Sequence, residues 1–220
     1  ITVKEPWRSG VSFLVSSGIE PEKYIKGVNR DRTQLLKEAL NSDFNCFQSS
    51  SMGRFFDGVS ALIGLCNYNT YDGEAAIIIE NNTEPGVTQL YSYDIDNINS
   101  EWLIDYGKII QGIIDDMEQG ISISIISSKF HNTVIDFTVN MVIGLSKESG
   151  IIDVVLSGGV FQNSYLLSGI YRRLKELGFN TYFNEMIPIN DGGLSLGQIA
   201  IEDDKFEEGS KNVFSSSCKD

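Results

Sequence analysis

The stretch that decides the fold class of this chain is residues 151–163, which read IIDVVLSGGVFQN. Its β-branched run from Ile151 to Leu156 predicts a short strand. Ser157-Gly158-Gly159 follows at once, and glycine permits a tight turn in which the backbone comes close to a ligand. Because apolar spacing then predicts a helix over residues 161–177, the turn joins a strand directly to a helix.

A second strand and a second glycine-rich loop follow this helix. Residues 179–183 predict the strand, residues 187–190 predict a third extended stretch, and Asp191-Gly192-Gly193 opens a final helix that reaches about residue 202. Alternating strands and helices of this kind predict an α/β fold. Both glycine-rich loops lie at the carboxyl ends of strands, where open α/β sheets bind ligands.

The chain before residue 150 reads as mostly helical. Pro6 is compatible with a helix start, and apolar spacing predicts a helix over residues 31–44 with Asp31 as its N-cap. A further helix over residues 49–66 is expected to end around Gly64.

Residues 74–80 favour a strand by propensity, because three isoleucines follow one another, although a short helix stays open. Residues 81–100 read as loop, with a strand near residues 90–93. Two amphipathic helices are expected after it, one from about Ile104 to Gly120 and one over residues 122–148.

Composition and charge exclude several functions. The chain has 220 residues, with 17 Lys+Arg and 30 Asp+Glu, and its formal net charge of −13 argues against a nucleic-acid partner. His131 is the sole histidine, so a metal site made of several imidazoles is excluded within this sequence. We expect no membrane segment and no signal peptide. Three cysteines without CxxC spacing, Cys46, Cys66 and Cys218, predict reduced thiols in a cytoplasmic protein.

Three motifs are candidates for chemistry. The Gly158-Gly159 turn before a helix offers free N–H groups to a phosphate or ribose, or is simply a tight turn without a ligand. Asp191 is either a helix N-cap or a carboxylate ligand to a cation. Gly53 and Asp57 lie one helical turn apart, where Asp57 either accepts hydrogen bonds from a ribose or sits at the solvent edge of its helix.

Five segments together resemble one family. They read SSSMGRFFDGVSALIGL, YDGEAAIIIE, KFHNTVIDF, VVLSGGVFQNSYLL and ELGFNTYFNEMIPINDGGLSLGQ, in the order and spacing of the HypF carbamoyltransferases. With EPWR at residues 5–8, the likeness covers roughly residues 5–202. The resemblance implies the second half of the HypF nucleotide- and metal-binding module, an α/β fold of the sugar-kinase/Hsp70/actin-like (RNase H-like) superfamily with a helix-rich insertion. It implies a leading helical segment over 1–45, a nucleotide-binding subdomain over 46–204 and a flexible tail over 205–220.

HypF enzymes supply the carbamoyl group for the cyanide ligands of nickel-iron hydrogenases. The resemblance implies that ATP or AMP, as carbamoyl-adenylate, is the cofactor and that the C-terminal cysteine of HypE accepts the carbamoyl group. It also implies a divalent metal, iron or zinc. The partners would be the HypE tail and the missing N-terminal half of the same protein, with no nucleic acid and no membrane.

The resemblance also assigns roles to residues. Those that would hold the nucleotide are Gly53, Asp57, Gly158, Gly159 and Asn163. Asp191 would be a metal ligand. His131 matches a histidine of the FHNT segment and would act catalytically near the site, although a lone helical histidine is more often structural.

The sequence departs from the family in what it lacks. Superfamily members with this chemistry hold the metal with an HxxxH pair, and the acylphosphatase-like, zinc-finger and adenylate-forming parts of HypF are missing here. We therefore expect a fragment that binds nucleotide but neither makes the adenylate nor completes the metal centre. Two alternatives stay open: a relative of the tRNA threonylcarbamoyl-transferases, and a non-catalytic module that binds nucleotide or docks a partner.

Overall fold

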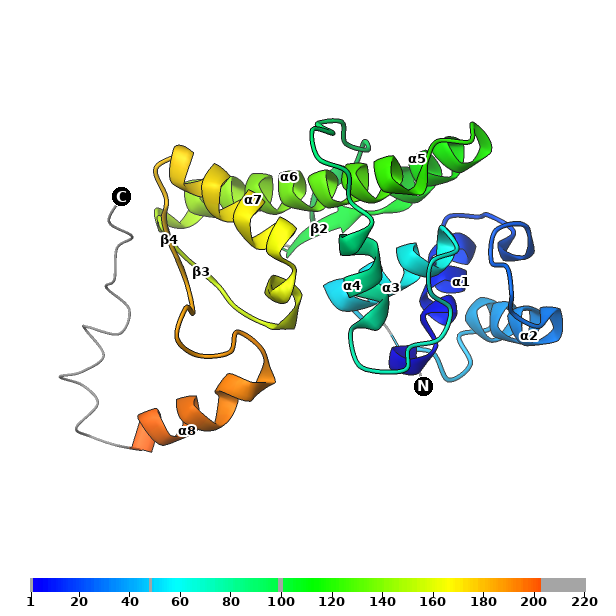
Figure 1. Ribbon diagram of the computed structural model, residues 1–220, viewed down its shortest axis with the longest axis horizontal. Coiled ribbons are helices and arrows are strands. Elements are labelled where there is room, and N and C mark those ends of the chain that lie inside the picture. Colours follow the sequence, from blue (N-terminus) through cyan, green and yellow to red (C-terminus); the bar gives the residue numbers. More distant parts are fainter. Residues whose placement is uncertain (1, 48, 99–100, 203–220) are drawn as a thin grey trace. The chain divides into compact units, whose positions relative to one another are not determined.

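The computed structural model describes residues 2–47, 49–98 and 101–202, so Cys218 and the predicted tail over 205–220 lie outside the described residues. The chain divides into two compact units, Ile1–Glu148 and Ser149–Asp220. Figure 1 shows the helices and strands of each unit. The boundary expected at residue 45 stays a prediction.

Unit 1 is mostly helical. Its elements are η1 (Thr2–Lys4), α1 (Pro6–Ser16), η2 (Pro21–Lys23), α2 (Arg30–Asn41), α3 (Met52–Leu62), α4 (Glu74–Asn81), β1 (Asp94–Ile98), β2 (Glu101–Asp105), α5 (Gly107–Glu118) and α6 (Ile123–Ser149). The helices expected near Pro6, over 31–44, over 49–66 and over 122–148 are thereby confirmed. The predicted N-cap Asp31 is wrong: α2 begins one residue earlier, and the Asn29 side chain accepts the Asp31 N–H at 2.7 Å.

The strand favoured for residues 74–80 is wrong, because α4 is a helix over Glu74–Asn81. Its buried side chains are Ala75 and Ile79, four residues apart, so the helical period decides which face packs against α3. The β-branched propensity of the isoleucine run is overridden by this packing.

Residues 94–105 differ from expectation as well. They form the antiparallel hairpin β1–β2, in which Ile95 pairs with Ile104, so Ile104 does not begin the following helix. No strand forms at residues 90–93, since the Tyr91 N–H is held at 2.8 Å by the Thr133 hydroxyl of α6. The hairpin lies against α6 through Trp102, which occupies the space beside Gly144.

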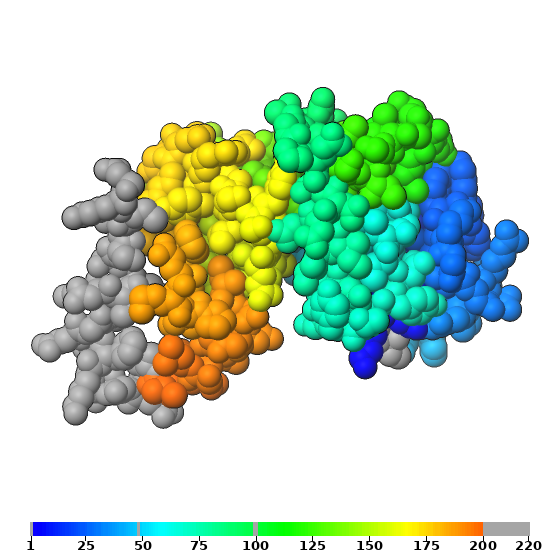
Figure 2. All heavy atoms as spheres, viewed as in Figure 1, coloured from blue at the N-terminus to red at the C-terminus, as the bar shows by residue number. Residues whose placement is uncertain are grey.

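The core of unit 1 is formed where its helices cross closely. Gly10 of α1 faces Gly58 of α3, and a Cβ atom on Gly58 would come within 2.6 Å of the Phe13 ring. The ring of Phe130 on α6 makes edge contacts with Phe55 and Phe56, at centroid distances of 5.1 and 4.8 Å. In the space-filling view, residues of α1 to α4 form one continuous mass of atoms (Figure 2).

Unit 2 contains the predicted α/β unit. Its elements are β3 (Asp153–Leu156), η3 (Gly159–Gln162), α7 (Ser164–Glu176), β4 (Asn180–Phe183), η4 (Asp191–Gly193) and α8 (Leu194–Glu202). β3 and β4 are parallel, with Asp153 opposite Asn180. α7 covers one face of this pair, where Tyr171 contacts Phe183. The extended stretch expected at 187–190 is not a strand.

Candidate functional site

The first group of predicted residues lies on α3. Ser51 caps this helix, and its side-chain oxygen accepts the Arg54 N–H at 3.4 Å. Gly53 sits in the first turn, where an added Cβ would meet no atom closer than the Ser51 hydroxyl at 3.7 Å, so packing alone does not require glycine there. One turn later, the side chain of Asp57 is 1% exposed and pairs with Arg54, with 2.5 Å between Oδ2 and Nη1.

Burial dominates the electrostatics of Asp57. It raises the pKa of this carboxyl to about 6, and the nearby charge of Asp72 adds to the increase. The Arg54 guanidinium and the Asn69 side-chain amide act in the opposite direction, because both stabilise the carboxylate. Asp57 is thus an interior carboxylate that changes charge within one pH unit or so of neutrality.

His131 lies inside unit 1 on α6. Its side chain is fully buried, its ring contacts Phe56 edge-on, and its Nδ1 lies 2.7 Å from the Ser127 carbonyl oxygen. A carbonyl only accepts, so Nδ1 carries the proton. Burial lowers the pKa of His131 to about 4, and the imidazole is neutral at pH 7. These contacts suit a residue that orders the core, and its catalytic role stays a prediction.

The second group of predicted residues lies at the end of β3. Gly158 has φ +102°, a conformation that disfavours side chains, and no atom lies within 4 Å of the Cβ positions of Gly158 or Gly159. Asn163 ends this turn and caps α7, because its Oδ1 accepts the Leu166 N–H at 2.9 Å. The strand, the open glycine turn and the helix start are therefore arranged as the sequence predicted.

The tertiary structure brings the second glycine-rich loop to the first. The Gly158 N–H donates to the Ile189 carbonyl at 3.0 Å, which places residues 189–193 beside the turn. Asn190, not Asp191, caps η4 by accepting the Gly192 N–H at 3.0 Å. The Asp191 carboxylate is consequently free of the capping role and exposed at this edge.

The described residues do not fit a complete metal site. Within 2–47, 49–98 and 101–202, no group of three His, Cys, Asp or Glu side chains could hold an ion. Asp191 is a single carboxylate, and stable sites need several ligands. Its assignment as a metal ligand stays a prediction that depends on donors outside these residues.

The predicted residues thus form two groups. Gly53, Asp57 and His131 belong to unit 1, whereas the Gly158 turn and Asp191 belong to unit 2. Within each unit, residues distant in sequence are brought together, as Gly158 and Ile189 show.

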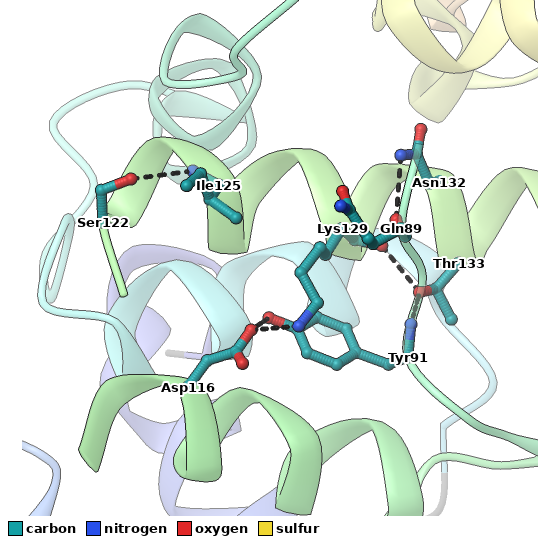
Figure 3. A network of polar contacts seen from close by, with 8 residues as sticks. All are labelled: Gln89, Tyr91, Asp116, Ser122, Ile125, Lys129, Asn132 and Thr133. Carbon is teal, nitrogen blue, oxygen red and sulfur yellow. Dashed lines mark hydrogen bonds and ion pairs between the residues drawn. The ribbon is translucent and has the colours of Figure 1, made fainter. Parts of the chain in front are cut away.

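A polar network in unit 1 was missed by the sequence. The Tyr91 hydroxyl donates to Asp116 at 2.8 Å, and Lys129 pairs with the same carboxylate oxygen at 2.5 Å while lying over the Tyr91 ring (Figure 3). Burial and the Asp116 charge raise the pKa of Tyr91, so its hydroxyl stays protonated. No spacing in the sequence could reveal this network, because its members come from a loop, α5 and α6.

The network lies beside a cavity of about 410 Å³ between α5 and residues 90–92. The chain leading into residues 90–92 is hydrogen-bonded to side chains that lie one helical turn apart on α6. Asn132 donates to the Gln89 carbonyl at 3.0 Å, and Ser128 accepts the Glu84 N–H at 2.6 Å (Figure 3 shows the first of these contacts). These hydrogen bonds to α6 take the place of the strand pairing expected for residues 90–93.

Comparisons with known proteins identify the fold. The family model for the carbamoyltransferase Kae1-like domain, second subdomain, matches residues 1–198. The fold and the glycine turn therefore belong to a Kae1-like carbamoyltransferase domain, which confirms the α/β class. More particularly, this chain belongs to the HypF carbamoyltransferase family, as the C-terminal subdomain of that module.

Individual relatives agree with this assignment. HypF of Synechocystis sp. is 38% identical over 152 residues, covering 69% of this chain and 19% of the relative. Probable carbamoyltransferase HypF of Methanocaldococcus jannaschii is 30% identical over 205 residues, covering 90% and 26%. A crystal structure of full-length HypF in its phosphate- and nucleotide-bound form shares 36% identity at a TM-score of 0.82, covering 90% of this chain and 26% of that one.

The chain thus spans about a fifth to a quarter of the length of these relatives. None of the helices within the described residues has the length and apolar character needed to cross a membrane. Cys46 and Cys66 are free thiols.

Proposed function

We propose that this chain is the nucleotide-binding subdomain of a carbamoyltransferase that passes the carbamoyl group of carbamoyl-adenylate to the C-terminal cysteine of HypE. The observation that carries the proposal is the Gly158-Gly159 turn, which leaves open space beside the backbone at the start of η3 and α7. The nucleotide- and phosphate-bound state of a relative 36% identical supports it. The partners are the HypE tail and the missing N-terminal half of the same protein.

The glycine turn fits a phosphate or ribose because the open backbone at Gly158 and Gly159 lets a ligand come close to the start of η3. Asn163 holds that helix start in place through its cap. Gly53 offers an equally open backbone on α3. Asp57 is 1% exposed, so a ribose hydroxyl would reach its carboxylate only after the side chains around it move.

The proposed transfer needs no nucleophile from this chain. A cysteine thiolate of the partner attacks the carbamoyl carbon, a C–S bond forms, the C–O bond to the phosphate breaks, and AMP leaves with the electron pair. N–H donors at the turn stabilise the leaving phosphate. A divalent metal, when bound with ligands from elsewhere, would polarise the carbonyl as a Lewis acid.

Calorimetry with AMP and with ATP tests nucleotide binding. We expect binding by the wild-type chain and a loss of at least about tenfold in Gly158→Ala, because a Cβ at φ +102° distorts the turn. Gly178→Ala is the matched control: Gly178 has φ +87° and ends α7 away from the turn. The proposal fails if the wild-type chain binds neither nucleotide, or if both variants weaken binding equally.

Transfer assays separate the enzyme proposals. A tRNA N6-adenosine threonylcarbamoyltransferase of Thermotoga neapolitana is 25% identical over 198 residues, which keeps a tRNA acceptor as an alternative, although the charge of −13 opposes it. We expect this chain alone to carbamoylate neither a cysteine-terminated HypE peptide nor tRNA. Full turnover by the chain alone would contradict its assignment as an incomplete fragment, and binding without transfer in any reconstituted protein would favour a non-catalytic module.

A further inference from the structure

The Asp57 carboxylate, the proposed acceptor of a ribose hydroxyl, is held by Arg54. The two residues lie one turn apart on the same face of α3, with 2.5 Å between Nη1 and Oδ2. The Arg54 side chain is 23% exposed and that of Asp57 is 1% exposed, so the guanidinium lies on the solvent side of the carboxylate. A ligand that reaches Asp57 therefore meets Arg54 first.

This ion pair is close, but its hydrogen bonding is incomplete. Within the described residues, neither Nη1 of Arg54 nor Oδ2 of Asp57 has a hydrogen-bond partner of good geometry. A bidentate arginine–carboxylate pair would satisfy both atoms. Gly53, one turn before Asp57, leaves open backbone on the same face of α3. A hydroxyl that approaches over Gly53 can therefore bind Oδ2 without breaking a well-formed hydrogen bond.

Arg54 is also the cation that favours the charged form of Asp57. Burial raises the pKa of Asp57 to about 6, and the Arg54 charge acts against this rise together with the Asn69 amide. Two further ionisable groups face the carboxylate from the chain between α3 and α4. The Asp72 charge raises the pKa of Asp57, and the Cys66 thiol has a pKa raised by burial and, to a smaller degree, by the Asp57 charge.

The helices packed against α3 supply no substitute for this cation. α1 and α4 both contact α3, but none of their charged groups acts on Asp57. Within the described residues, Arg54 is the only cation that does so. Loss of its charge would leave the buried Asp57 carboxyl largely protonated near neutral pH.

We propose that Arg54 is a positioning residue of the nucleotide site, which keeps the Asp57 carboxylate charged and in place until a ribose hydroxyl donates to it. A carboxylate accepts a hydroxyl more strongly than a neutral carboxyl group does, so the pair makes the site prefer ribose to deoxyribose. This inference rests on the proposal that the chain binds nucleotide through Asp57. It adds the residue that makes Asp57 a selective acceptor.

Carbon-13 NMR of the Asp57 carboxyl tests the first part of the inference without any ligand. We expect its titration to move to higher pH in Arg54→Gln and to stay near its wild-type position in Arg54→Lys, which keeps the charge. Arg32→Gln is the matched control, because Arg32 also pairs with a carboxylate of unit 1, that of Glu5, and does not act on Asp57. The same Asp57 titration in Arg54→Gln and in wild type would overturn the inference.

Calorimetry with AMP, 2′-deoxy-AMP and 3′-deoxy-AMP tests the second part. At pH 7 the wild-type chain should bind AMP about tenfold more tightly than the analogue that lacks the hydroxyl bound by Asp57. Arg54→Gln should reduce this preference to about twofold at pH 7 and regain it at pH 9, where Asp57 ionises. Arg54→Lys and Arg32→Gln should keep it at both pH values. The ratio of affinities cancels the titration of the phosphate, which the three ligands share.

The outcomes separate this inference from the proposed function. If the wild-type chain binds AMP but Arg54→Gln keeps the full preference at pH 7, the inference alone is overturned. A preference that is lost at pH 7 and not regained at pH 9 overturns it as well, because a merely structural role of Arg54 would have that effect. Absence of AMP binding by the wild-type chain refutes the proposed function and this inference with it.

A second variant covers the case in which Arg54→Gln does not fold. Arg54→Gln/Asp57→Asn leaves no buried charge at this position, so the fold loses less. We expect this variant to show no preference for the ribose hydroxyl at pH 7 or at pH 9. A preference that survives in it would contradict the inference.

Discussion

Unit 1 and unit 2 differ in how much of their apolar surface they bury. In unit 1, side chains such as Trp7, Phe56 and Phe130 are at most 1% exposed, and helices enclose them on several sides. In the described part of unit 2, the buried apolar side chains are Leu156, Leu166, Ile170 and Leu174. Unit 1 therefore has a core enclosed by several helices, whereas the described part of unit 2 buries its apolar side chains between α7 and the β3–β4 pair.

Shortening a buried side chain of unit 1 should have the largest effect on stability. Phe130→Ala should lower the free energy of unfolding of unit 1 by about 3–5 kcal/mol, because a fully buried ring is lost from an aromatic cluster. Hydrogen exchange resolved by residue is the measurement, and Tyr71→Ala, at a side chain 53% exposed, is the control.

The two units should respond separately. Leu174→Ala should speed exchange in residues 153–183 and leave α3 and α6 unchanged. If Phe130→Ala and Leu174→Ala each destabilise both units to the same degree, the division into two units is wrong.

The polar network sharpens the description of unit 1. Lys129→Met should lower the free energy of unfolding by about 3 kcal/mol, because the largely buried Asp116 carboxylate then keeps the Tyr91 hydroxyl but loses its cationic partner in the network. Denaturant unfolding measures the loss. The double variant Lys129→Met/Asp116→Leu should lose less than the single one, since no charge is left buried. A double variant that loses as much as the sum of both single changes would contradict the ion pair.

The pH dependence of unit 1 comes from two buried groups with opposite signs. The pKa of His131 falls from 6.5 to about 4, so the unfolded chain binds the extra proton and stability falls as pH drops from 6.5 to 4. The pKa of Asp57 rises from 3.8 to about 6, so the folded chain holds the proton and stability falls as pH rises from 4 to 6.

Variants separate the two effects. Asp57→Asn should lose stability on acidification more steeply than wild type, and His131→Gln should lose less, each by about 2 kcal/mol between pH 6.5 and 4.5. Urea midpoints at the two pH values measure this. Identical pH profiles for all three proteins would refute the assignment of buried titration to these residues.

The smallest expected effect concerns the helix start beside the glycine turn. Asn163→Ala should lower the free energy of unfolding by about 1 kcal/mol, because α7 loses the side chain that accepts the Leu166 N–H. Exchange of the first amides of α7 measures the loss, and Asn163→Ser should restore most of it. Equal exchange in the Ala and Ser variants would show that the cap does not stabilise this helix.

Patterns that act locally predicted the elements well. The β-branched run of β3, the double glycine and the apolar spacing of α6 act within a few residues, and each formed as expected. The strand favoured for residues 74–80 failed because burial of Ala75 and Ile79 against α3 outweighs propensity. The prediction of a helix at Ile104 is wrong, because a short apolar stretch fits the helix period and the strand period equally well.

The motifs that the sequence offered as site residues were found, but their environments were not foreseen. Asp57 looked like a residue at a helix edge or a ribose ligand, and it is an interior carboxylate paired with Arg54. His131 looked like a catalytic candidate, and its contacts are with the core. Burial depends on which helices pack together, so no motif reveals it.

The sequence by itself determined the family, the fold class and the glycine turn, because motifs and the conformational freedom of glycine are properties of neighbouring residues. The tertiary structure alone decided that Gly158 meets Ile189 and that Tyr91, Asp116 and Lys129 form one network. These contacts join residues far apart along the chain. They form because folding buries apolar surface and brings those residues together, which no pattern of neighbouring residues records.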